Sequence, residues 1–415
     1  MNFEEAVQYL FGLGHEILTM KLGLRNTELL FQSLDNPERS FPAVQIAGTN
    51  GKGSTAVMLD SVCRAAGITT GLYTSPHLVS ITERIQIAGK QISEDDFARH
   101  ATTVRDAAQR LLDSGKLEAL PTFFEHVTAI ALLAFREAGI ELAILETGMG
   151  GRLDSTTAAN ASTVAITSIA MDHEQYLGSM IESIASEKAA IIRPGVTAII
   201  GKQDPRALAV LLQRCEATGV QPILATPPSA RIRVGLRGKH QLENAAIAIA
   251  VAQSLSIPPE AILSGIETAS HPGRLELISN EPDILLDGAH NPAGADALRD
   301  YLNEFDCRPL TIVFGAMSDK QLDRIGELLF PLADNLILTT IDNPRTASLE
   351  TLAAIAVRSA RGSVTKSKTI SDAFQTSLRI TPREGLICVT GSLYLIGEWK
   401  REHGTAKNHQ QPKGF

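Results

Sequence analysis

The chain has 415 residues, 44% of them hydrophobic, so it can bury a large core and is expected to divide into two domains or a little more. Its net charge of −8 and the lack of a tract rich in lysine and arginine argue against duplex nucleic acid and anionic membranes as partners. Four widely spaced cysteines, an acidic N-terminus and the lack of any ~20-residue apolar run predict a reduced, cytoplasmic protein without disulfides, a zinc site, a signal peptide or a membrane span.

The first segment, residues 3–34, predicts two amphipathic helices separated near residues 23–25. Asn26 is a candidate cap of the second helix. A helical hairpin packed on a sheet and a segment that borders a ligand site are both open for this region, and we assign it no catalytic role.

Residues 44–55 read V-Q-I-A-G-T-N-G-K-G-S-T, an apolar strand followed by a glycine-rich turn and a helical pattern. Such a turn can cradle phosphate, because backbone N–H groups and the start of the helix present partial positive charge, and Lys52 adds a mobile cation. The hydroxyl of Ser54 or Thr55 can ligate Mg²⁺. The spacing departs from G-x-x-x-x-G-K-[ST], so a glycine-rich turn without a ligand is the alternative.

Two further segments carry polar groups beside aromatic or apolar residues. The strand predicted at 68–73 delivers T-S-P-H-L to a loop, where His77 is most simply a structural hydrogen-bonding residue. The segment Phe123-Phe124-Glu125 opens an apolar helix. Two adjacent aromatic rings beside a carboxylate can stack a flat heterocycle, although core packing is the commoner role of phenylalanine.

Two apolar strands end in candidate metal ligands. The strand from Leu142 ends at Glu146 and is followed by glycines, and a strand predicted at 164–170 is followed by Asp172 and His173. Carboxyl ends of parallel strands meet at one edge of a sheet, so Ser54, Ser75, Glu146 and His173 are expected to converge. A strand-terminal turn with a solvated glutamate is the alternative for Glu146, and imidazole is an uncommon Mg²⁺ ligand.

The rest of the chain predicts a second α/β unit. A small-residue helix begins near Asn244, and Pro272-Gly273 interrupts the pattern and marks a domain boundary. Strands and helices alternate again beyond it, with D-G-A-H-N-P at a strand-to-helix turn. The predicted fold class is therefore α/β: an N-terminal, mainly parallel P-loop-type sheet with helices on both faces, and a smaller Rossmann-like C-terminal domain.

Several of these motifs resemble one known family. G-T-N-G-K-G-S at 48–54 resembles the nucleotide loop of the Mur ligase superfamily, and its G-K-G-S ending is most similar to the folylpolyglutamate synthase and dihydrofolate synthase branch. The resemblance extends from about residue 20 to residue 397. Further motifs follow in family order: T-S-P-H-L at 74–78, L-E-T-G-M-G-G-R-L-D at 145–154, S-I-A-M-D-H at 168–173, S-E-K-A at 186–189, Q-L-E-N-A-A at 241–246, H-P-G-R at 271–274 and D-G-A-H-N-P at 287–292.

The resemblance implies a set of site residues and cofactors. The cofactors are ATP and two Mg²⁺ ions, and a monovalent cation is a further candidate. The family lysine that corresponds to Lys188 is carbamylated, which turns an ammonium into a metal-binding carboxylate. The implied residues are, for the nucleotide, Asn50, Gly51, Lys52, Gly53, Ser54, Thr55, Asn244, Arg274 and Asp287; for metal, Ser54, Ser75, Glu146, His173 and Lys188; for substrates, Phe123, Phe124, Glu125, Arg152 and His290; and for catalysis, Lys52, Lys188 and His290.

Each of these roles has a simpler structural alternative. A helix lysine such as Lys188 is usually a solvated surface charge. Arg274 suits phosphates through its fork of donors, but it can equally be a surface residue beside a turn. Asn244 can be a polar residue in the first turn of its helix, and D-G-A-H-N-P can be a plain Asx-type turn that caps a helix.

The resemblance implies an ATP-dependent ligase that joins L-glutamate to dihydropteroate, to a reduced folate, or to both, through an acyl phosphate. It also implies an ATP-binding domain with the pterin site at 1–272 and a ligase domain at 273–405. The polar composition of the C-terminal residues predicts a disordered tail at 406–415. A cytoplasmic monomer is expected. The alternatives are a Mur-type amino-acid ligase with another carboxylate substrate and a non-catalytic, ATP-gated binding module. No N/T-K-x-D motif of a P-loop GTPase is present.

Overall fold

The computed structural model describes residues 1–14, 23–228, 232–278, 281–305 and 309–403. The chain forms two compact units, one of Met1–Gly235 with Gln241–Ser270, and one of Leu236–His240 with His271–Phe415. The functional domains predicted at 1–272 and 273–405 stay predictions, and the tail predicted at 406–415 lies outside the described residues. In the part of the chain that is described, no helix is long and apolar enough to cross a membrane.

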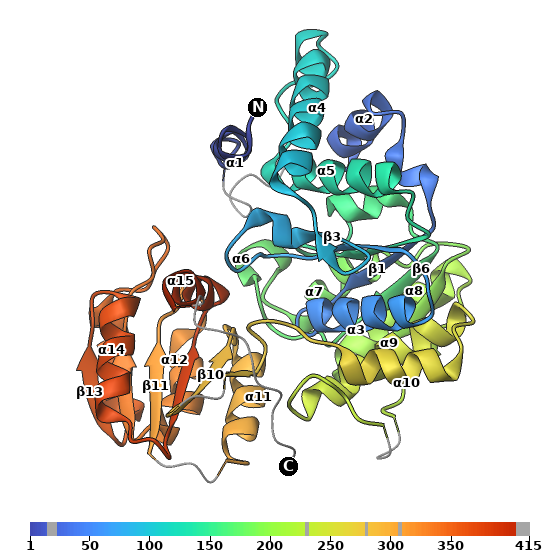
Figure 1. Cartoon of the computed structure of the whole chain (residues 1–415). Coiled ribbons are helices and arrows are strands. Elements are labelled where there is room, and N and C mark those ends of the chain that lie inside the picture. Colours follow the sequence, from blue (N-terminus) through green and yellow to red (C-terminus); the bar gives the residue numbers. More distant parts are fainter. Residues whose placement is uncertain (15–22, 229–231, 279–280, 306–308, 404–415) are drawn as a thin grey trace. The chain divides into compact units, whose positions relative to one another are not determined.

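The first unit is built on a mainly parallel sheet of eight strands in the order β4-β3-β2-β5-β1-β6-β7-β8. Figure 1 labels β1, β3 and β6 of this sheet. Among the described strands of this sheet, β3 pairs antiparallel with both β2 and β4. Every residue of β1 and β5 is buried, as expected for central parallel strands that are covered on both faces. The strands are β1 (Ala43–Ala47), β2 (Thr70–Tyr73), β3 (Ile85–Ile87), β4 (Lys90–Gln91), β5 (Leu142–Glu146), β6 (Thr163–Ile166), β7 (Thr197–Ile200) and β8 (Ile223–Leu224).

Helices connect and cover these strands. One core joins the strands to α4 and α5, and a second packs β6 and β7 against α7 and α8. The α-helices of this unit are α1 (Phe3–Gly12), α2 (Arg25–Ser33), α3 (Lys52–Ala65), α4 (Glu94–Asp113), α5 (Phe123–Ala138), α6 (Glu174–Leu177), α7 (Ile181–Ala189), α8 (Pro205–Thr218), α9 (His240–Ser254) and α10 (Pro259–Thr268).

The sequence pattern predicts most of these elements, with two corrections. Asn26 does not cap α2, because Leu24 occupies the cap position and Asn26 lies inside the helix. The strand predicted at 164–170 ends at Ile166. Beyond it, the chain turns from the sheet to the glycine-rich loop between β1 and α3, which we call the phosphate loop. The carbonyl oxygen of Ser168 accepts hydrogen bonds from the backbone N–H groups of residues 49 and 50 in this loop.

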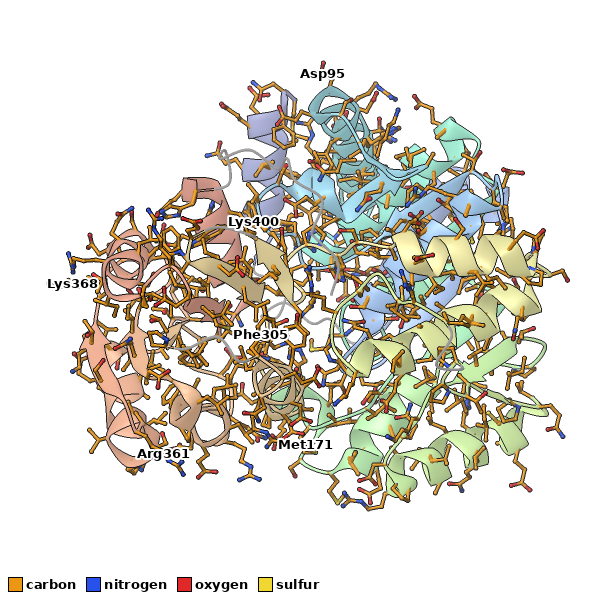
Figure 2. All side chains as sticks on the ribbon, turned by 60° about the horizontal axis from the view of Figure 1, so that its bottom comes forward. Asp95, Met171, Phe305, Arg361, Lys368 and Lys400 are labelled. Atoms are coloured by element: carbon orange, nitrogen blue, oxygen red, sulfur yellow. The ribbon has the colours of Figure 1, made fainter. Side chains whose placement is uncertain are left out.

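The second unit holds a six-stranded sheet in the order β13-β12-β11-β14-β10-β9, parallel except for β9. Lys400, labelled in Figure 2, pairs with Glu276 at 2.7 Å and ties the last helix to the edge strand. The elements are β9 (Glu276–Ile278), β10 (Asp283–Asp287), α11 (Pro292–Leu302), β11 (Leu310–Phe314), α12 (Leu322–Leu329), β12 (Asn335–Leu338), α13 (Leu349–Ser359), β13 (Ser363–Lys366), α14 (Ile370–Ile380), β14 (Leu386–Thr390) and α15 (Leu393–His403).

The cysteines behave as the sequence predicts wherever they are described. Cys63, Cys215 and Cys388 are buried and free. Burial raises the pKa of the Cys63 thiol to about 12, so it stays protonated near neutral pH. Cys307 lies outside the described residues.

Candidate active site

The phosphate loop lies between β1 and α3, and its backbone conformation depends on glycine. Gly51 precedes the first residue of α3 with φ of +86°, and no side chain caps this helix. A Cβ atom at Gly51 would lie 2.0 Å from Oδ1 of Asn244, so no larger residue fits there. Gly51 therefore supplies no side-chain oxygen to the N–H groups of the first helical turn, and such groups are suited to binding an anion.

Gln241 joins the phosphate loop to α9, a link that the sequence pattern does not predict directly. Its Nε2 lies 3.4 Å from the hydroxyl oxygen of Ser54, and its Oε1 accepts a 2.9 Å hydrogen bond from Nδ2 of Asn244. Gln241 and Asn244 are three residues apart and so share one face of α9. This spacing is the sequence signal that could have identified Gln241.

Lys188 is buried against the same loop. It lies in α7 with a side chain that is almost inaccessible, and its Nζ donates a 2.7 Å hydrogen bond to the carbonyl oxygen of Gly48. Burial, with a further contribution from the charge of Lys52, lowers the pKa of Lys188 to about 7. The surface-charge alternative for Lys188 is therefore wrong. A large fraction of such an amine is neutral and nucleophilic near neutral pH.

Glu146 ends β5 and is almost fully buried, so the alternative of a solvated turn glutamate is wrong. Its Oε2 accepts a 3.0 Å hydrogen bond from the backbone N–H of Ser75. Glu83 holds the loop that follows Ser75, because its carboxylate accepts three hydrogen bonds of 2.8 Å from backbone N–H groups at 78–80. In the same loop, Nε of Arg84 donates to Nδ1 of His77 at 2.9 Å, so His77 has a structural partner.

The segment after Glu146 is shaped by a buried carboxylate and a buried amide. Asp154 accepts hydrogen bonds from the backbone N–H groups of Gly148 and Met149, at 2.9 and 3.1 Å. Gln45 of β1 donates to the hydroxyls of Thr156 and Thr157 at 3.0 and 2.7 Å. In the sequence, Asp154 is recognisable only as part of a motif, and Gln45 only as part of an apolar strand.

The aromatic pair at the start of α5 divides into two roles. Phe123 is buried, stacks on Phe11 with 5.4 Å between ring centroids, and has the guanidinium of Arg84 5.3 Å from its centroid. Phe124 is only partly buried, and a Cβ atom at Gly148 would lie 2.6 Å from its ring. This packing favours a core role for Phe123 and places Phe124 beside the loop after Glu146. Substrate binding by either ring stays a prediction.

Glu125 performs a structural task that its position in the helix explains. Its Oε2 accepts a 2.7 Å hydrogen bond from the N–H of Thr122, and its Oε1 accepts a 2.9 Å hydrogen bond from the hydroxyl of Thr27. The first of these forms a capping box at the start of α5. The carboxylate therefore joins α5 to α2, and its expected substrate contact stays a prediction.

His173 and Arg152 differ in their surroundings. His173 has φ of +52°, and its Nε2 lies 4.0 Å from Oδ2 of Asp172. Arg152 is exposed, and its Nε lies 3.0 Å from Oε1 of Glu187. The predicted roles of His173 in metal binding and of Arg152 in substrate binding stay predictions.

In the second unit, Asp287 ends β10 and is buried. Its carboxylate accepts hydrogen bonds from the N–H groups of Leu275 and Ala289, at 2.8 and 3.0 Å. Burial raises the pKa of Asp287, against the opposing effect of Arg274. Nδ1 of His290 lies 2.8 Å from the carbonyl oxygen of Gly288. This oxygen can accept a hydrogen bond from an N–H group at Nδ1, which favours the tautomer protonated at that nitrogen.

D-G-A-H-N-P does cap a helix, because Oδ1 of Asn291 accepts a 2.8 Å hydrogen bond from the N–H of Gly294 at the start of α11. The Asx-type alternative therefore describes Asn291 correctly. It does not account for the burial of Asp287.

The candidate metal ligands are of mixed chemistry. Within the described ranges, no group of three or more His, Cys, Asp or Glu residues is arranged to hold a metal ion. The candidates are instead hydroxyls, one carboxylate, one imidazole and the amine of Lys188. Hydroxyl and carboxylate oxygens suit Mg²⁺, and a carbamate on Lys188 would add two more oxygens, so the donor set fits a magnesium site.

Comparison with known proteins identifies the family. The Mur ligase middle domain model matches residues 46–226, and the Mur ligase glutamate ligase domain model matches residues 273–393. The dihydrofolate synthase/folylpolyglutamate synthase of Mycobacterium tuberculosis is 36% identical over 380 residues, which cover 80% of this chain and 77% of that protein. The chain belongs to the folylpolyglutamate synthase/dihydrofolate synthase family of Mur ligases.

Members of this family differ in length. The Bacillus subtilis dihydrofolate synthase/folylpolyglutamate synthase is 32% identical over 92% of this chain and 95% of that protein. A probable bifunctional folylpolyglutamate synthase/dihydropteroate synthase of Halobacterium salinarum is 34% identical over 96% of this chain. The chain spans only 51% of that longer relative.

Solved structures of the family share the fold. A Mycobacterium tuberculosis folylpolyglutamate synthase complexed with ADP aligns with a TM-score of 0.90 and 30% identity, covering 98% of this chain and 99% of that chain. An Escherichia coli structure, FolC in complex with DHPP and ADP, aligns with a TM-score of 0.87 and 27% identity over 97% of both chains. The predicted fold class is confirmed by these neighbours.

Proposed function

We propose that this chain is an ATP-dependent ligase that joins L-glutamate to the carboxylate of a pteroate or folate. The γ-phosphoryl group of ATP is transferred to a carboxylate oxygen of the substrate, giving ADP and an acyl phosphate. The glutamate amine then attacks the acyl carbon, loses a proton and displaces inorganic phosphate. One observation carries the proposal. Lys188 of α7 is buried and donates a hydrogen bond to the carbonyl oxygen of Gly48 in the phosphate loop, whose sequence is typical of this family.

The phosphate loop would hold the nucleotide. Asn50 and the backbone from Gly51 to Thr55 present N–H groups at the start of α3, and Lys52 supplies a cation for the transferring group. Asn244 packs on Gly51 and is the candidate contact of α9 with the nucleotide. The neighbouring Mycobacterium tuberculosis structure is complexed with ADP, which supports nucleotide use by this chain.

Divalent metal would be held by Ser54, Ser75, Glu146, His173 and a carbamate on Lys188. When bound, the ion supplies positive charge that stabilises the transferring phosphoryl group. A Yersinia pestis neighbour is complexed with AMPPNP and a Mn ion, which supports divalent metal use. The partly neutral amine of Lys188 is suited to react with CO₂, and the carbonyl of Gly48 orients it.

The candidate residues of the second unit are Arg274, Asp287 and His290. The guanidinium of Arg274 suits phosphate oxygens, and the buried carboxylate of Asp287 shapes the turn that presents His290. Because Nδ1 of His290 faces the carbonyl of Gly288, we assign Nε2 to the incoming amino acid or to phosphate.

The substrate is proposed to be dihydropteroate, a reduced folate, or both. Phe124, beside the loop that follows Glu146, is the candidate stacking residue for the pterin. The Escherichia coli neighbour is complexed with DHPP, which supports a pteroyl substrate. We also propose a cytoplasmic monomer, consistent with free, buried cysteines at the three described positions.

ADP release by the purified protein tests this function. The substrates are dihydropteroate, tetrahydrofolate and a muramyl-peptide precursor, each with and without L-glutamate. Glutamate-dependent release with either pterin is expected. Release with dihydropteroate alone would restrict the chain to dihydrofolate synthase activity, and release only with the muramyl precursor would reassign it to another Mur-type ligase.

A further inference from the structure

The segment 167–170 lies along the phosphate loop rather than in the sheet. The last residues paired between β1 and β6 are Ala47 and Ile166. Beyond them, the carbonyl oxygen of Ser168 accepts hydrogen bonds from the N–H groups of Thr49 and Asn50, at 2.8 and 3.1 Å. The segment therefore continues the contact between these two stretches of backbone past the end of the strands.

A Cβ atom at Gly48 would lie 1.8 Å from Oγ1 of Thr167, so the closeness of the two stretches depends on glycine at this position. The same backbone carries the carbonyl that accepts from Lys188. The phosphate loop thus contacts α7, which bears Lys188, and the segment that leads to His173.

The hydroxyl of Thr49 closes this junction. Its Oγ1 donates to the carbonyl oxygen of Ala170 and accepts from the N–H of the same residue, both at 3.1 Å. One atom that both donates and accepts is needed for this pair of hydrogen bonds, and only serine or threonine supplies it at this short reach. Asp172 and His173 follow Ala170 within three positions.

Gln203, which follows β7, holds the segment from another direction. Its Oε1 accepts a 3.0 Å hydrogen bond from the N–H of Ile169, and its Nε2 donates a 2.9 Å hydrogen bond to the carbonyl oxygen of Thr167. The segment 167–170 is outside any helix or strand. The side chains of Thr49 and Gln203 therefore supply hydrogen bonds that its backbone would otherwise form with a neighbouring strand.

We propose that Thr49 and Gln203 are positioning residues that hold segment 167–170 on the phosphate loop and thereby set His173 relative to Ser54. The inference rests on the proposed function, in which Ser54 and His173 are metal ligands. Neither Thr49 nor Gln203 is among the candidate metal ligands. Their loss changes how well the divalent ion is held, because it frees the backbone that carries His173.

The decisive comparison is Thr49→Val against Thr49→Ser in the full chain. Valine keeps the branched shape without the hydroxyl, and serine keeps the hydroxyl. Mn²⁺ affinity is measured by electron paramagnetic resonance with ADP present, and kcat and the KM for ATP are measured in the ADP-release assay. Thr49→Val is expected to weaken Mn²⁺ binding by about 10–100-fold, the usual effect of losing a group that orients a ligand. Thr49→Ser is expected to restore most of the affinity.

Gln203→Met provides the second, independent arm, since it keeps the length of the side chain and removes both hydrogen bonds. It is expected to weaken Mn²⁺ binding in the same direction, and it decides the question if Thr49→Val does not fold by circular dichroism. The inference would be overturned if both variants fold and both bind Mn²⁺ as tightly as the wild-type protein. If Thr49→Val is unfolded, wild-type Mn²⁺ affinity in Gln203→Met alone would overturn it. If the wild-type protein binds Mn²⁺ and ADP but shows no glutamate-dependent turnover, the proposed function fails while the metal-binding comparison still tests the two residues.

Discussion

Nζ of Lys188 donates a hydrogen bond to the carbonyl oxygen of Gly48 at 2.7 Å, so a buried amine of α7 contacts the loop expected to hold the nucleotide. A charged lysine in this place would be costly unless it were paired. The pKa of about 7 shows how the protein reduces that cost, since a large fraction of the amine is neutral at neutral pH. Reaction with CO₂ would convert it into an anion that a metal ion can pair.

The first prediction is that Lys188 carries a carbamate whose occupancy rises with pH. The pKa of the amine is lowered to about 7, so the nucleophilic neutral form is a minority at pH 6 and predominates at pH 8. The measurement is an NMR spectrum of the metal-free protein in isotope-labelled bicarbonate across this range. Lys188→Gln is the control and should lack the signal. A wild-type spectrum without a carbamate signal at pH 8 would contradict the prediction.

The second prediction concerns the cation of the phosphate loop. Lys52→Ala is expected to lower kcat by about 100-fold or more without unfolding the protein, because the lost charge acts on the transferring phosphoryl group. Lys202→Ala is the matched control, since it removes an exposed lysine that pairs with Glu243 at 2.9 Å on the surface. Folding is checked by circular dichroism. A folded Lys52→Ala variant with more than about a tenth of wild-type kcat would rule out this role.

The third prediction separates packing from chemistry. A Cβ atom at Gly265 of α10 would lie 2.3 Å from Cα of Val62 in α3, so Gly265→Ala forces the two helices apart. The expected loss of unfolding free energy is about 1–3 kcal/mol, measured by urea denaturation. Gly12→Ala is the control, because nothing lies within 4 Å of the added atom. Equal stability of the two variants would show that α3 and α10 are packed more loosely than this distance implies.

The local pattern of the sequence was enough to predict the phosphate loop and the acidic end of β5. An apolar strand that runs into glycines, Lys52 and hydroxyls is typical of a loop that binds phosphate, and Glu146 follows a strand of the same kind. The parallel sheet then places both at one edge. The extra residues predicted for β6 show where the pattern misleads, since T-S-I-A is apolar enough for a strand but binds the phosphate loop instead.

The residues that hold the site in place could not be predicted in the same way. Gln241, Glu83 and Thr49 act through hydrogen bonds to partners that the fold, rather than the local sequence, brings near. For Phe123 the local sequence predicts too much. An aromatic residue beside a carboxylate suggests a ligand site, but Phe123 is buried and stacks on Phe11, which favours a place in the core.

The central claim is that the chain adds L-glutamate to a pteroyl or folyl carboxylate through an acyl phosphate. The most direct test uses dihydropteroate and tetrahydrofolate whose carboxylates carry heavy oxygen, with ATP, Mg²⁺ and L-glutamate, and analyses the products by mass spectrometry. We expect a product with one added glutamyl residue and one heavy oxygen atom transferred to inorganic phosphate. Formation of the glutamylated product with unlabelled inorganic phosphate would contradict the acyl-phosphate intermediate. The absence of a glutamylated product from both substrates would contradict the proposed function.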